Sequence, residues 1–120
     1  INGSVQEKLT LMIGSGSTTM SMDYNSSSIF YLSSSTATTT WNVINFPTTS
    51  NRATAITFVT EQGATPYSAS AYQINGTPVT VKWLNGITPS GNANKTDVIG
   101  LTAFRSGSSL NVLGSLSTFG

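Results

Sequence analysis

The chain has 120 residues, a formal net charge of +1, no cysteine and no histidine, and only 8% of its residues are charged. This length suits one domain, and the scarcity of helix formers beside 38 Ser and Thr residues favours β-structure. The basic residues are scattered rather than clustered, which argues against a nucleic-acid-binding surface, and no apolar run is long enough for a membrane span. They are Lys8, Arg52, Lys82, Lys95 and Arg105.

The first half of the chain predicts short strands separated by Gly, Ser and Asn. Apolar side chains alternate over residues 5–13 and again over residues 20–24, and this pair is interpreted as a first hairpin. Residues 29–32 form a short apolar strand, and the hydroxyl-rich tract 33–40 is an exposed strand or a long connection. In residues 41–46 the apolar positions change parity between Val43 and Ile44, which predicts a bulge or bend.

The second half continues the β pattern. Strands are expected over residues 53–60 and 67–74, and Asn75-Gly76 predicts a type I′ hairpin whose return arm runs through Val79 and Trp83. Residues 85–94 form the longest loop, and two further strands, 98–104 and 110–119, are joined by a turn at 106–108. The prediction is a single all-β domain over 1–120, an antiparallel β-sandwich or jelly roll of eight to ten short strands without significant helix. Because the first residue is Ile rather than Met, we expect it to be part of a longer or processed polypeptide.

Candidate catalytic and metal-binding residues are few. A Ser-His-Asp triad needs an imidazole, and the chain has none. The carboxylates are Glu7, Asp23, Glu61 and Asp97, and we expect them to be solvated or to cap turns rather than to form a catalytic pair. Asn92, Asn94 and Asp97 form the one cluster of oxygen ligands, for which loop hydrogen bonding is the favoured use. We therefore expect no enzyme activity, cofactor or metal.

Aromatic residues offer the one alternative with a ligand. Trp41, Tyr67, Tyr72 and Trp83 suggest a sugar-stacking platform, although the strand register of the two tryptophans favours the core. The candidate glycan contacts are Tyr67, Tyr72, Asn92 and Asn94.

From Asn42 onward, about two thirds of the chain resembles a β-domain that recurs at the C-terminal ends of tail-fibre and other virion structural proteins of marine bacteriophages, especially cyanophages. The matching segments are residues 41–46, 55–67, 81–83, 91–94 with Asp97, and 110–119. The resemblance implies a non-enzymatic virion protein, either a tail-fibre or appendage module, a capsid decoration protein, or a receptor-binding tip. It brings no catalytic residues.

A virion module would contact other virion proteins and copies of itself, with a trimer favoured for a fibre, and a host-surface glycan is a further candidate partner. Large apolar residues in segments that cannot all face one small core are the candidate subunit contacts: Met20, Met22, Phe30, Tyr31 and Phe119.

Overall fold

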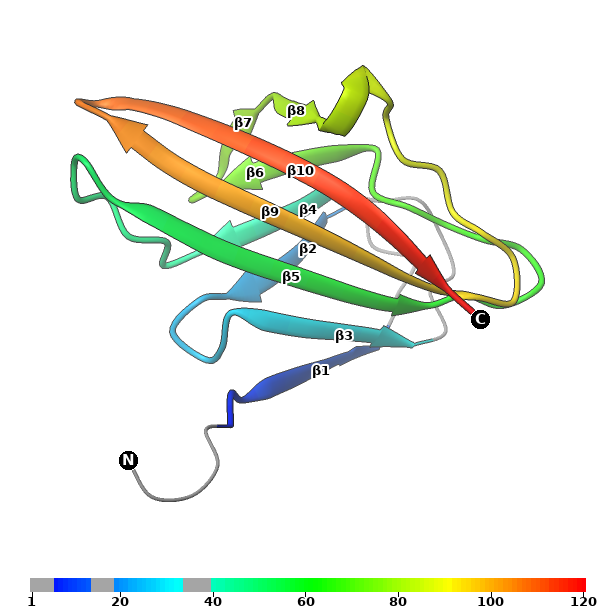
Figure 1. Ribbon diagram of the computed structural model, residues 1–120. Helices are drawn as coiled ribbons and strands as arrows, with labels where there is room; N and C mark the ends of the chain where they lie inside the picture. Colours follow the sequence, from blue (N-terminus) through cyan, green and yellow to red (C-terminus); the bar gives the residue numbers. More distant parts are fainter. Residues whose placement is uncertain (1–5, 14–18, 34–39) are drawn as a thin grey trace.

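The computed structural model describes residues 6–13, 19–33 and 40–120, and these form two β-sheets packed face to face. The six-stranded sheet has the order β1-β3-β5-β9-β10-β8, and the four-stranded sheet has the order β2-β4-β6-β7. In Figure 1 the larger sheet lies in front of the smaller one. The strands of the larger sheet are β1 (Leu9–Ile13), β3 (Ile29–Ser33), β5 (Ala53–Glu61), β8 (Val81–Trp83), β9 (Thr96–Ser106) and β10 (Ser109–Phe119). Those of the smaller sheet are β2 (Thr19–Asp23), β4 (Thr40–Ile44), β6 (Ala71–Ile74) and β7 (Thr77–Val79). The predicted all-β sandwich of about ten strands is thus confirmed.

Strand direction differs from the prediction in the first half of the chain. From β1 to β6 the chain alternates between the two sheets, so that β1, β3 and β5 are parallel neighbours, as are β2, β4 and β6. The predicted hairpin of residues 5–13 and 20–24 is therefore wrong, because the chain crosses to the opposite sheet instead of turning back. Among the described strands, antiparallel pairing is confined to β5-β9, β9-β10 and β6-β7, and the edge strand β8 is parallel to β10.

At some of the turns, the local sequence was sufficient to predict the structure. Asn75 and Gly76 both have positive φ, and they close the predicted hairpin between β6 and β7. After Val79, however, the chain leaves that sheet, and Val81–Trp83 pairs with β10 as β8. The predicted bulge or bend near Ile44 is a bend at Asn45, directly after β4, where a positive φ shifts the alternation so that Phe46 returns to the core. Most of the hydroxyl tract 33–40 lies outside the described residues.

The core lies between the sheets and follows the period of two along each strand. In β2, β3 and β4 every second residue is buried, and the remaining positions point outward. Phe58 of β5 sits among three aromatic rings, with centroids 4.9 Å from Trp41, 6.0 Å from Phe30 and 6.4 Å from Tyr72. This arrangement fixes which residues each sheet presents outward.

Candidate interaction surface

The residues predicted as subunit contacts separate into two groups. Met20, Met22 and Phe30 are buried between the sheets, with at most 6% of each side chain exposed. They are core residues, and the prediction that they contact another subunit is wrong, because alternation on their strands directs them inward. Tyr31 is half-buried and Phe119 is 59% exposed, and both lie on the outer face of the six-stranded sheet. Their role as contacts stays a prediction.

The residues predicted to contact a glycan do not form one site. Tyr72 is buried, with its ring packed edge-on against Trp41 and tilted toward Trp83, so its assignment as a surface contact is wrong. Burial raises the pKa of the Tyr72 hydroxyl. Tyr67 is half-buried, and Asn94 is exposed in a left-handed turn. Their contact with a glycan is untested.

Asn92 and Asp97 form a hydrogen-bonded corner between the long loop and the end of the larger sheet. The buried carboxylate of Asp97 accepts from the Asn92 side chain and the Thr118 hydroxyl at Oδ1, both at 2.9 Å. Its Oδ2 accepts from the Asn92 backbone N–H at 2.9 Å and from the Gln62 side chain at 3.0 Å. The predicted use of Asn92 and Asp97 in loop hydrogen bonding is confirmed.

Gln62 extends this corner to the preceding loop. Its side-chain oxygen accepts from the Tyr67 backbone N–H at 3.0 Å, and its side-chain nitrogen donates to the Tyr67 carbonyl at 2.6 Å. Gly91 is needed here, because a Cβ at that position would lie 2.7 Å from the Cβ of Pro66. Burial alone would raise the pKa of Asp97, but the hydrogen bonds from Asn92, Gln62 and Thr118 outweigh it and hold the pKa below its usual value. With four donors directed at it, this carboxylate is a structural acceptor.

The other carboxylates lie on different surfaces. Asp23 ends β2, where it accepts from the Asn25 backbone and the Asn45 side chain, and these bonds lower its pKa. Glu61 points outward from the end of β5, and its hydrogen bond with the Tyr31 hydroxyl raises the pKa of that tyrosine. Glu7 is exposed before β1. Within the described residues, no group of three or more potential metal ligands comes together.

The outer face of the six-stranded sheet carries an apolar patch. We use this name for Leu9, Leu11, Ile29, Tyr31, Val59 and Val98. Leu9 pairs in register with Ile29, and Leu11 lies in a row with Tyr31, Val59 and Val98 across four strands. Leu11 is 72% exposed and Leu9 is 43% exposed. An apolar row of this extent on a sheet surface is characteristic of an interaction site.

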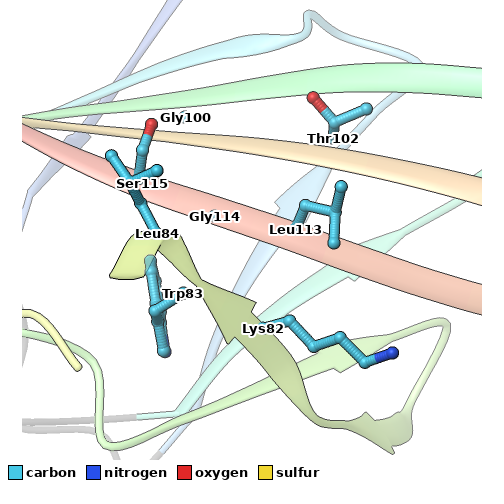
Figure 2. Close-up of a pocket in the computed structure, with 8 residues that line it drawn as sticks. All are labelled: Lys82, Trp83, Leu84, Gly100, Thr102, Leu113, Gly114 and Ser115. Carbon is cyan, nitrogen blue, oxygen red and sulfur yellow. The ribbon is translucent and has the colours of Figure 1, made fainter. Parts of the chain in front are cut away.

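A groove opens at the opposite end of the same face, where β8 forms the edge of the sheet (Figure 2). It has a volume of about 340 Å³. The lining residues are Lys82, Trp83, Leu84, Gly100, Thr102, Leu113, Gly114 and Ser115. We call it the Trp83 groove.

Two glycines shape the Trp83 groove. A Cβ on Gly114 would lie 2.6 Å from the Trp83 ring, so the absent side chain lets the indole lie against β10. Gly100 leaves the outer face open above β9, since the nearest atom to a Cβ there would be the Ser115 hydroxyl at 3.9 Å. Leu84, 64% exposed, lines the groove, and Ile87, 70% exposed, lies beside it. This groove was not predicted from the sequence, although the two large apolar residues that flank the Asn85-Gly86 turn were an available signal.

No family model, curated protein or solved structure matches the chain. In the described part of the chain, no helix has the length and hydropathy that a membrane span requires.

Proposed function

We propose that this chain is a non-enzymatic structural protein of a bacteriophage virion, a tail-fibre or appendage module that assembles through the surface of its larger β-sheet. The observation that carries the proposal is the apolar patch, in which Leu11 and its row of neighbours remain on the outside of an otherwise complete sandwich. Burying this patch against another virion subunit would remove it from water. The resemblance of residues 41–119 to virion β-domains supplies the type of particle.

The distribution of ionisable groups supports a structural rather than a catalytic role. The Asp97 carboxylate accepts hydrogen bonds from four donors on the inner side of the larger sheet, while Glu61 points to the outer side of the same sheet. Asp23 lies at the end of a strand of the other sheet. Hydrolysis of a polysaccharide by two carboxylates would need a pair facing one cleft, and these three point to separate environments.

A capsid decoration protein or a glycan-binding tip is the alternative. The tip is favoured by another hollow of about 290 Å³ at the seam of the sheets, which is bordered by the half-buried ring of Trp83 and by the hydroxyl residues Thr80 and Thr88. Aromatic rings beside hydroxyl groups are suited to sugar stacking. Glycan-array binding that is lost on replacing Trp83 but retained in a Leu11→Lys variant would select the tip over the assembly module.

Assembly is tested by measuring the mass of the protein in solution by multi-angle light scattering. We expect an oligomer that Leu11→Lys dissociates, because a lysine ammonium would be buried in the interface. Ser21→Lys is the matched control, since Ser21 is an exposed outward residue of the smaller sheet. A mass that is unchanged by Leu11→Lys would contradict assembly through this face.

The particle assignment needs a separate measurement. Mass spectrometry of gradient-purified phage particles that encode this chain should detect its peptides in amounts comparable to other tail proteins. Peptides found in the lysate but absent from the purified particles would overturn the virion assignment.

A further inference from the structure

The outer face of the six-stranded sheet has a charge pattern that points to its occupant. Among the outward-pointing strand residues described, Glu61 on β5 and Lys82 on β8 are the charged ones, and they have opposite signs. Glu61 adjoins Tyr31 of the apolar patch, and Lys82 lines the Trp83 groove. The face therefore carries one acidic and one basic group, each beside a different apolar feature.

We propose that the partner of this face is a second copy of the chain, related by a two-fold axis, with the apolar patch of each copy lying over the Trp83 groove of the other and Glu61 opposite the partner's Lys82. The inference rests on the proposed function, because it names the subunit that covers the same face. A partner surface of a single charge sign would leave either Glu61 or Lys82 without a counterion, whereas a second copy supplies both.

The strand register locates the axis. Three strand spacings of about 4.8 Å separate β5 from β8, and six residues of about 3.4 Å separate the level of Glu61 from that of Lys82. The midpoint of this diagonal falls between β9 and β10, where the outward residues are Val98, Gly100, Ser115 and Ser117. Three of these four have small side chains or none, so two copies can approach closely at the axis.

The same operation brings the apolar features together. The two-fold axis runs between the two faces, perpendicular to that diagonal. A rotation of 180° about it places the β5 end of one face over the β8 end of the other. Val59 and Tyr31 of one copy then lie above the open space at Gly100 and Thr102 of its partner. Because patch and groove share one face, a single two-fold contact engages both features of both copies. A head-to-tail trimer would need two neighbours over the same face, and they would collide.

The available area is adequate for a stable dimer. Five strand spacings of about 4.8 Å and roughly nine residues of about 3.4 Å give a face of about 700 Å². A standard specific interface buries about 800 Å² on each partner.

Charge reversal tests the pairing. We expect the wild-type chain to be a dimer by analytical ultracentrifugation, and Lys82→Glu to weaken it about 10-fold at low ionic strength by placing two carboxylates together. Glu61→Lys should weaken it similarly. The double variant, Lys82→Glu with Glu61→Lys, should restore the dissociation constant to within about 3-fold of the wild-type value, because the pairs are re-formed with the signs exchanged.

The control is Arg52→Glu, which makes the same charge change at an exposed residue of the turn before β5 and should leave the dimer intact. An oligomer that Leu11→Lys dissociates but in which the double variant fails to restore affinity would overturn the two-fold pairing while leaving the proposed function in place. A trimeric mass would have the same consequence. An oligomer that is insensitive to Leu11→Lys would instead overturn assembly through this face altogether.

Discussion

The outer faces of the two sheets differ although both sheets come from the same charge-poor sequence. On the four-stranded sheet the central outward row consists of the hydroxyl and amide residues Ser21, Asn42 and Gln73, which lie side by side in register. On the six-stranded sheet the outward positions of β1 and β3, together with Val59 and Val98, hold leucine, isoleucine, tyrosine and valine, while β9 and β10 mostly carry small or polar residues there. The inner faces are alike, since both are apolar and buried.

The scarcity of charged residues therefore has a different consequence on each sheet. On the smaller sheet, hydroxyl and amide groups replace ions as the water-contacting surface. In the apolar patch of the larger sheet, apolar side chains take the outward positions, as expected for a surface that another subunit covers. The overall composition averages the two faces and cannot separate them.

The largest expected effect tests which side chains of β5 face the core and which face outward, because the comparison of the two outer faces depends on this assignment. Phe58→Ala should lower the free energy of unfolding by about 3–5 kcal/mol, because it removes a fully buried ring that contacts three others. Thr57→Ala, one residue away on the outer face, should change it by less than about 1 kcal/mol. Guanidinium denaturation measures both, and equal losses would mean that the register of β5 is misassigned.

The next effect compares the aspartates of the two sheets. Asp97→Asn should cost about 1–3 kcal/mol, because an amide nitrogen would replace an oxygen that faces two donors. Asp23→Asn, at an exposed turn of the smaller sheet, should cost less. Asn92→Ala tests the same corner from the donor side: it removes the side-chain donor to Asp97 and should also be destabilising.

The pH dependence of stability follows from the lowered pKa values. Asp97 and Asp23 have folded-state pKa values below their unfolded values, so their contribution is present above the unfolded pKa of about 3.9 and is lost as pH falls through the folded pKa. Thermal unfolding should therefore show a fall in stability below about pH 5 that is reduced in Asp97→Asn. An unchanged acid limb in this variant would argue against the four-donor site.

A smaller effect should come from the two glycines of the Trp83 groove. Gly114→Ala should cost about 1 kcal/mol, the low end for overpacking, because the half-exposed indole of Trp83 can swing outward. Gly100→Ala is the matched control and should be nearly neutral for folding, since its Cβ would meet only ordinary contacts. A shift in tryptophan fluorescence in the first variant alone would confirm the contact, and identical spectra for both would contradict it.

Much of the fold was predictable from local signals. Alternating apolar residues located the strands, and the turn residues Asn75-Gly76 and Gly107 ended them at the correct places. The hydrogen-bonding role of Asn92 and Asp97 was also recognisable, because they are only five residues apart in the sequence, where the long loop meets β9. Each of these features depends on residues that are close together in the sequence.

The parts that failed depend on contacts distant in sequence. The alternation of apolar residues along a strand does not show to which sheet the strand belongs. For this reason β1 and β2 were predicted to form a hairpin, although they lie in opposite sheets. For the same reason Met20, Met22 and Phe30 resembled surplus apolar surface, whereas the second sheet provides the core that buries them. The apolar patch combines residues from β1, β3, β5 and β9, and only the register brings them together.

The smallest expected effect tests the two outer faces directly with nearly isosteric changes. If the larger sheet is covered by another subunit, the melting temperature of the wild-type chain should rise with protein concentration, because association stabilises the folded state by mass action. Val59→Thr places a hydroxyl in the apolar patch and should reduce this dependence, while Thr40→Val makes the reverse change on the smaller sheet and should leave it unaltered. Both substitutions preserve β-branching and volume, so strand propensity stays similar. Calorimetry over about a hundred-fold range of concentration distinguishes the faces. A melting temperature independent of concentration would show that the apolar face of the larger sheet stays exposed to water under these conditions, and the contrast between the sheets would then have to come from something other than self-association.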